Sequence, residues 1–395
     1  MRIISASKGL LGVLLCCTVA ASAQPKGAAG GAPAPPQSQS AAATPAPPPA
    51  PSVWSVGSLD FSGLVDAYYS YNANRPSNAA NGQINDLYNF NDKTDQFNLS
   101  MAKLTINHDP APIGVHADLI FGRANDLIHS STDKNTDSYL EQAYISAVPP
   151  KWHGTELDFG QFVTSAGAEV IEAMNDWNYS RSILFTWAIP YYHFGLRTST
   201  PVTKSWTAGL QVVNGWNNVV NNNGGVTIGL TSLYTKSKYN WALNYYVGPE
   251  NTDTQKGYRN LIDTTLNLTP TSKFSAYLNY DYGQNRMAAS SAGPEDSAHW
   301  QGGAIATNYQ FTDKNSFALR GEYFDDNQGF STGTAQALKE ATGTYQYKWA
   351  NGLLARVEAR HDWSNQNFFH KGDKEMVNGQ TTLTVAFIAF FGPKH

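Results

Sequence analysis

The chain has 395 residues, of which 41% are hydrophobic and 15% are charged, and its formal net charge is −4. A mildly acidic chain without runs of basic residues argues against nucleic acid as a partner. After residue 24 no segment approaches roughly 18 consecutive apolar residues, so we expect no membrane-spanning helix.

Residues 1–23 are predicted to be an export signal. Arg2 and Lys8 give a positive start, residues 9–20 form a short apolar segment, and Ala23 ends a small-x-small pattern. This order is typical of a cleaved signal peptide. Both cysteines of the chain lie inside the segment, so its removal leaves no disulfide or thiolate metal site.

The next segment, residues 24–52, is rich in Pro, Ala, Gly, Ser and Gln. Such a composition cannot bury enough apolar surface to offset the entropy of ordering, so it predicts a disordered tether. Residues 53–395 are then expected to form a single folded domain.

Strand-like alternation is clearest at residues 353–362. Leu353, Ala355, Val357 and Ala359 fall on one face of a strand, and the opposite face carries charge. Ten residues suit a tilted strand that crosses a bilayer. The pattern recurs in segments 59–68, 206–212, 262–268, 274–281 and 317–324. Modest apolar faces opposite polar faces indicate lipid outside and water inside.

The connections between these segments alternate in length. The short ones are expected at residues 109–112, 149–153, 201–204, 235–238, 269–272, 312–315 and 349–352. The long polar ones are expected at residues 72–94, 123–136, 164–190, 214–224, 248–256, 284–298, 325–332 and 363–374. Short periplasmic turns and long external loops are typical of outer-membrane barrels. Seven turns and eight loops predict an all-β, antiparallel up-and-down barrel of about 16 strands, with eighteen as the alternative.

Three segments carry a family resemblance. Residues 167–197 (GAEVIEAMNDWNYSRSILFTWAIPYYHFGLR) and 212–223 (VVNGWNNVVNNN), with the ending at residues 390–394, resemble the OmpL-like family of β-barrel porins. The resemblance covers the chain after the tether and implies an outer-membrane channel. It supplies no catalytic residues.

The third external loop, residues 164–190, is expected to fold into the lumen, by analogy with general porins. Residues 168–174 have helical spacing, so that Val170, Ile171 and Met174 could face the wall. An external lid that never enters the lumen is the alternative.

Charged residues of this loop and of the wall are the candidate pore constriction. They are Glu169, Glu172, Asp176, Arg181, Arg197, Arg320, Arg356 and Arg360. Acids facing bases across a narrow aqueous gap would create a transverse field that selects hydrophilic solutes. The alternative is local pairing on the wall, of Arg356 with Glu358 and Arg360 with Asp362.

The function predicted is passive diffusion of small hydrophilic solutes and ions across the outer membrane of a Gram-negative bacterium. The alternatives are a receptor or adhesin barrel with a closed lumen, and a sugar-selective porin using Tyr68, Tyr246 and Tyr277. Because the sequence has no recognisable nucleophile or metal-ligand motif, we expect no catalytic residues, no metal and no cofactor.

The expected partners follow from this location. They are outer-membrane lipid and lipopolysaccharide, the solutes and the barrel-insertion machinery, while a homotrimer and a monomer both remain open.

Overall fold

The computed structural model describes residues 54–77, 83–129, 138–286, 297–349 and 352–392. All of them belong to one compact unit. The predicted signal at residues 1–23 and tether at residues 24–52 lie outside the described residues. Within the described part, no helix combines the length and the apolar character needed to cross a membrane.

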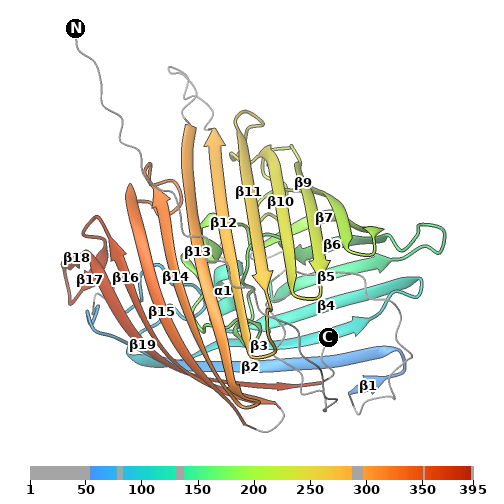
Figure 1. Ribbon diagram of the computed structural model, residues 1–395. Helices are drawn as coiled ribbons and strands as arrows, with labels where there is room; N and C mark the ends of the chain where they lie inside the picture. Colours follow the sequence, from blue (N-terminus) through green and yellow to red (C-terminus); the bar gives the residue numbers. More distant parts are fainter. Residues whose placement is uncertain (1–53, 78–82, 130–137, 287–296, 350–351, 393–395) are drawn as a thin grey trace, which may run out of the picture. The chain divides into compact units, whose positions relative to one another are not determined.

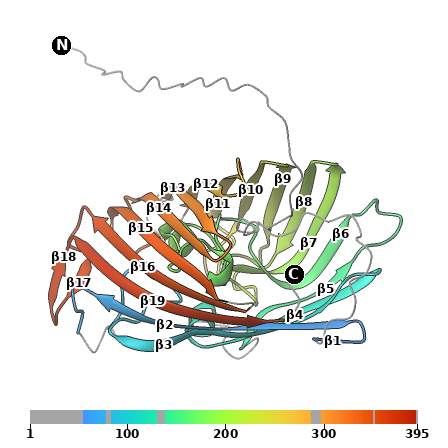
Figure 2. The same cartoon turned by 60° about the horizontal axis from the view of Figure 1, so that its bottom comes forward.

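Antiparallel strands joined in sequence order dominate the described chain (Figure 1). The ladder closes because β19 pairs with β2, and β9 pairs with β10 in the same sheet. Figure 2 shows β19, the last strand of the ladder, beside β2, its first strand. The sixteen strands of the closed ladder are β2 (Leu59–Asn72), β3 (Gln96–His108), β4 (Ile113–Phe121), β5 (Leu140–Ala147), β6 (Glu156–Val163), β7 (Tyr192–Thr203), β8 (Trp206–Val213), β9 (Thr227–Lys236), β10 (Tyr239–Pro249), β11 (Tyr258–Leu268), β12 (Phe274–Arg286), β13 (Ser297–Thr312), β14 (Asn315–Asp326), β15 (Gln336–Trp349), β16 (Leu353–Ser364) and β19 (Gly379–Phe391). Among the described residues, closure leaves this ladder without an edge strand, and the predicted sixteen strands are confirmed.

Short elements occupy the connections. β1 (Ser55–Val56) pairs with the start of β2, and a separate hairpin, β17 (Phe369–Lys371) with β18 (Glu375–Val377), precedes β19. The helix α1 (Arg123–Ile128) follows β4. Two further turns, η1 (Ala173–Asn175) and η2 (Leu184–Ala188), lie between β6 and β7.

The alternation expected along the strands is present, with apolar residues outside. On β16, Val357 is 46% exposed, whereas Arg356 and Arg360 are 2% and 1% exposed. A water-soluble domain would bury the valine and expose the arginines. The inverted arrangement fits a barrel whose outer face contacts lipid and whose polar face points inward.

The connection between β6 and β7 departs from the sequence prediction. No α-helix forms at residues 168–174; the chain there is irregular up to η1, with bends at residues 168 and 171. The Asp176 carboxylate accepts the Val170 amide at 3.0 Å, and Arg181 donates to the carbonyls of Val170 and Ile171. A helix would pair these two carbonyls internally, and the Val170 amide would lie in its unpaired first turn, so the contacts of Arg181 compete directly with the helical hydrogen bonds.

Candidate functional site

The long connection at residues 164–191, here called the third connection, is tied to several strands by buried polar contacts. Its Gly167 amide donates to Asp263 on β11 at 3.0 Å, and its Tyr179 hydroxyl donates to Asp66 on β2 at 2.8 Å. The amides of Tyr179 and Ser180 donate to Glu358 on β16 at 2.5 and 2.9 Å. Inward carboxylates of separate strands therefore bind one segment.

Arg320 on β14 is the centre of a buried ion network. One of its terminal nitrogens, Nη1, lies 2.7 Å from Glu169 Oε1 in the third connection and donates to the Ser180 carbonyl at 2.7 Å. Its Nε lies 3.0 Å from Glu322 and 3.1 Å from Glu340. The four charged side chains are at most 2% exposed. They therefore contact one another and are shielded from solvent.

Arg356 on β16 binds backbone instead of a carboxylate. It donates to the carbonyls of Ala173, Asp176 and Asn178 at 2.5, 2.5 and 3.1 Å, and to Gln346 Oε1 at 2.9 Å. A planar guanidinium with five donors suits such a set of carbonyl oxygens. Arg356 thus holds the third connection by its main chain.

Arg360, four residues further along β16, follows the local-pairing alternative and also binds the third connection. It pairs with Asp362 at 2.7 Å, as the local-pairing alternative predicts, and it donates to the Arg181 carbonyl at 2.7 Å. Its guanidinium also lies 4.2 Å from the Tyr88 ring centroid.

The expected aqueous gap between loop acids and wall arginines is not found at these residues. Arg320 contacts Glu169 directly, and Glu358 binds amides of the third connection instead of Arg356. Desolvated charges are stable only with close partners, so direct contact replaces a water-filled separation here. The prediction that these groups face each other across water is wrong for this part of the wall.

Asp176 and Arg181 pair inside the third connection. The Arg181 Nε lies 3.4 Å from Asp176 Oδ2, and both side chains are nearly inaccessible to solvent. The Arg181 guanidinium stands 5.0 Å from the Phe90 ring, which comes from the connection between β2 and β3. These two predicted site residues therefore shape the connection and do not face a solute.

Glu172 pairs with Lys103 on β3, a residue that the sequence reasoning missed. The Lys103 Nζ also lies 2.9 Å from Asp118 and 2.6 Å from Glu141. The three carboxylates approach one another closely enough to hold a cation, but the ammonium already lies among them. Glu172 is 16% exposed, more than the other acids of the cluster.

Arg197 on β7 stands apart from the arginine network. It pairs with Asp158 on β6 at 2.7 Å and lies over the rings of Phe162 and Tyr144 at 4.5 and 5.1 Å. Its side chain is 13% exposed. Of the wall arginines predicted for the constriction, it is the one in contact with solvent.

A hollow borders Arg197 along β7–β10. Its polar lining includes Ser165, Arg197, Thr207, Gln211, Thr231 and Asn244. Gln211 Nε2 donates to Ser165 Oγ at 3.0 Å, and Asn244 donates to the Ser165 carbonyl at 2.9 Å. The sequence prediction did not include these hydroxyl and amide groups, because it considered charged residues only. The uncharged polar residues on the inward face of the same alternating strands could have indicated them.

The tyrosines considered for sugar stacking are already engaged. Tyr68, Tyr246 and Tyr277 are at most 3% exposed. Their rings contact Tyr179, His193 and Trp177, respectively, at 5.9, 5.1 and 5.3 Å between centroids. Because these rings are covered, that route to sugar selectivity is not supported by the structure.

A closed sixteen-stranded barrel with an apolar exterior, a charged interior and a long connection bonded to that interior defines an outer-membrane porin. The chain belongs to the family described as "Putative beta-barrel porin-2, OmpL-like", whose model matches residues 58–391. The resemblance found in the sequence is thereby confirmed. Membership indicates an outer-membrane channel in preference to an enzyme. The comparison with curated proteins gave no match.

Solved structures share the architecture. An anion-selective porin from Comamonas acidovorans has 10% identity and a TM-score of 0.56, over 85% of this chain and 99% of that one. OmpT of Vibrio cholerae has 10% identity and a TM-score of 0.55, over 84% and 97%. Salmonella typhi OmpF in complex with daunomycin has 13% identity and a TM-score of 0.55, over 84% and 97%. At such identities the likeness shows the fold alone.

Proposed function

We propose that this porin allows passive diffusion of small hydrophilic solutes and ions, and that the third connection enters the lumen and narrows it. The observation that carries the proposal is the set of contacts from one segment to β2, β11 and β16. In a closed barrel β2 and β11 belong to opposite walls. A segment bonded to inward side chains of both walls has to cross the interior.

The passage runs on the side of β7–β10 in this proposal. The wall that carries Arg320, Arg356 and Arg360 is sealed by the third connection, since these side chains are at most 3% exposed. Among the charged residues predicted for the constriction, the partly exposed ones are Glu172 and Arg197. The constriction therefore involves these two residues and the hollow, while the buried arginines position the connection.

The lining favours neutral or weakly charged hydrophilic solutes. The hydroxyls of Thr207 and Thr231, which are partly exposed in this hollow, can exchange hydrogen bonds with a passing solute as readily as with water. Arg197 is balanced by Asp158, and Glu172 by Lys103. Because each exposed charge has a counter-charge beside it, we expect weak ion selectivity.

The remaining parts of the protein have supporting roles. Residues 1–23 direct export, and residues 24–52 form a periplasmic tether. The partners are outer-membrane lipid, lipopolysaccharide and the barrel-insertion machinery. We include a homotrimer, because one structure with the same fold, OmpT of Vibrio cholerae, is described in a trimer form. Enzymatic activity forms no part of the proposal.

Single-channel conductance tests the proposal. The protein from residue 24 onward is refolded and added to a planar bilayer at low concentration and neutral pH. We expect stepwise openings of uniform size. A folded, heat-modifiable barrel that never conducts would contradict the proposal and favour a receptor or adhesin with a closed lumen.

A further inference from the structure

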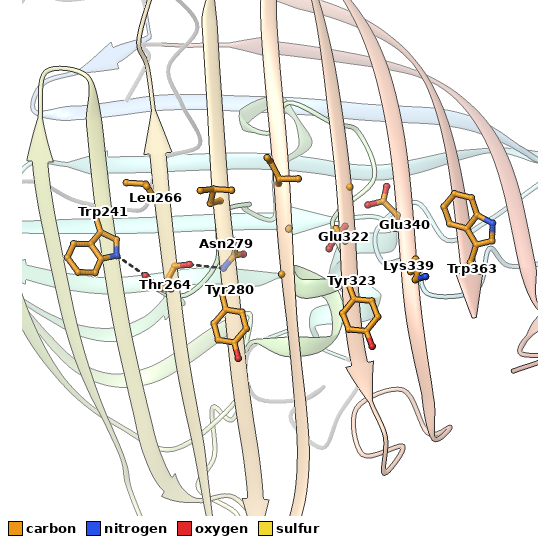
Figure 3. A pocket seen from close by; sticks show the side chains of 15 residues that line it. Trp241, Thr264, Leu266, Asn279, Tyr280, Glu322, Tyr323, Lys339, Glu340 and Trp363 are labelled. Atoms are coloured by element: carbon orange, nitrogen blue, oxygen red, sulfur yellow. Dashed lines mark hydrogen bonds between the residues drawn. The ribbon is translucent and has the colours of Figure 1, made fainter. Parts of the chain in front are cut away.

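The outer face of the barrel has a hollow of about 970 Å³ that extends across β10–β16 (Figure 3). We call it the outer-wall hollow. Its apolar lining includes Trp241, Leu278, Ile305, Tyr323 and Trp363. These residues are 44–53% exposed and alternate with buried inward residues, so they belong to the lipid-facing surface.

Two glycines form the floor of the hollow. A Cβ added at Gly303 on β13 or Gly321 on β14 would meet no atom closer than 3.8 Å, and neither glycine has a left-handed φ. Glycine weakens a strand interior and is usually retained for a bulge or a close approach. Neither reason applies here, so what these glycines provide is open space on the outer wall.

Aromatic rings border this space. In the strand register Gly303 lies between Tyr280 and Tyr323, both about half exposed. Figure 3 shows these two rings along one side and Trp241 and Trp363 at the ends. Rings and aliphatic side chains around a bare backbone floor give a long apolar slot, whose shape suits a hydrocarbon chain.

One positively charged side chain, that of Lys339, lies at the edge of the slot. Lys339 on β15 is exposed and lies between Tyr323 and Trp363 in the register. It forms no ion pair with any carboxylate in the described ranges. Lys339 is the fourth residue of β15, next to the connection with β14, at the end of the barrel that carries the long connections. In outer-membrane barrels that end faces outward, at the level of the lipid headgroups.

We propose that the outer-wall hollow binds a phosphorylated lipid of the outer leaflet, with one acyl chain along Gly303 and Gly321 and the phosphate on Lys339. Charge complementarity selects this occupant, because a lone ammonium beside an apolar slot matches an anionic headgroup above a hydrocarbon chain. A neutral lipid would leave Lys339 without a partner. The inference uses the outer-membrane location of the proposed function but does not depend on conduction.

Native mass spectrometry with lipid A as the probe tests the site. The refolded protein from residue 24 onward is titrated with lipid A in detergent. We expect one lipid to be retained more tightly than the rest. Lys339→Gln should weaken its retention about tenfold, since it removes a charge-assisted contact to phosphate. Gly321→Leu should abolish it by filling the floor.

Two matched variants serve as controls. Lys314→Gln removes an exposed lysine from the turn between β13 and β14, at the other end of the barrel. Gly343→Ala adds a methyl group on the outer face of β15, where ordinary contact with Phe317 at 3.4 Å accommodates it. Both should retain lipid A as the wild type does. Heat-modifiable migration in gels confirms that each variant is folded.

Equal retention of lipid A by the wild type, Lys339→Gln and Gly321→Leu would overturn the proposal. A changed oligomeric state in Gly321→Leu with unchanged lipid retention would also overturn it, because a second copy of the chain would then fill the hollow. Conductance of the same samples keeps the two proposals separate: normal channels without selective lipid retention reject the lipid site alone.

Discussion

Arg320 on β14 and Glu169 in the third connection form an ion pair of 2.7 Å from which solvent is excluded. The two residues are far apart in sequence, and the pair fastens a connection to a wall strand. Glu322 and Glu340 complete the charge around the same guanidinium. The pair therefore gives the third connection a fixed position, since neither ion can return to water while the connection stays in place.

Removing this guanidinium should destabilise the barrel. Arg320→Met leaves the carboxylates of Glu169, Glu322 and Glu340 buried without their shared cation, which typically costs about 3–5 kcal/mol. Urea unfolding in detergent measures the change in the free energy of unfolding. The exposed Lys314→Gln should change it by less than about 0.5 kcal/mol. A loss below about 1 kcal/mol for Arg320→Met would show that the network contributes little.

Arg356→Gln should loosen the third connection with a smaller effect on the strands. Three carbonyls of the connection lose their donor, while the ladder between β15 and β16 is unchanged. We expect larger or noisier single-channel conductance. Lys348→Gln, on the neighbouring strand, should conduct like the wild type. Channels of unaltered size and noise in Arg356→Gln would argue against a role for Arg356 in holding the connection.

Lys103 and Glu172 should affect ion selectivity in opposite directions. Lys103→Met leaves Asp118, Glu141 and Glu172 without the ammonium among them, so the passage becomes more negative and favours cations. Glu172→Gln removes one negative charge and favours anions. Reversal potentials in a KCl gradient measure both shifts. Two variants that keep the wild-type potential would place this cluster away from the ion path.

Glu250, after β10, should make stability depend on pH. Burial raises the pKa of its carboxyl above the usual 4.5, against the opposing charge of Arg259. Between 4.5 and the raised pKa the folded state binds more protons than the unfolded state, so stability increases as the pH falls through that window. Compared with Glu250→Gln, the wild type should gain stability on acidification. The midpoints of urea unfolding of both proteins at neutral and mildly acidic pH measure this gain. If the two midpoints change equally with pH, the raised pKa of Glu250 is contradicted.

The sequence predicts the barrel well because its signal is local. Alternation such as Val357 outside and Arg356 inside repeats within each strand, and the turn lengths separate the strands. Sixteen strands can therefore be counted without knowing any partner. The irregular third connection has no such period, and the helix expected at residues 168–174 is absent because Arg181 binds the Val170 and Ile171 carbonyls that it would need.

The partners of the charged residues could not be predicted in the same way. Arg320 and Glu169 were both identified as candidates, but their direct contact depends on how the connection crosses several strands. Lys103 and Gln211 lie on inward faces whose neighbours are set by closure of the barrel and by the loop against them. Such long-range contacts leave no spacing signature in a single sequence.

Thiol accessibility tests the position of the passage most directly. Both native cysteines lie in the first 23 residues, so a cysteine introduced into the refolded protein from residue 24 onward is unique. Thr231 borders the hollow along β7–β10, whereas Thr344 is 1% exposed and accepts a hydrogen bond from Asn178 of the third connection. We expect a charged methanethiosulfonate reagent to reduce the conductance of Thr231→Cys and to leave Thr344→Cys unchanged. Block at Thr344→Cys without an effect at Thr231→Cys would contradict the proposed passage.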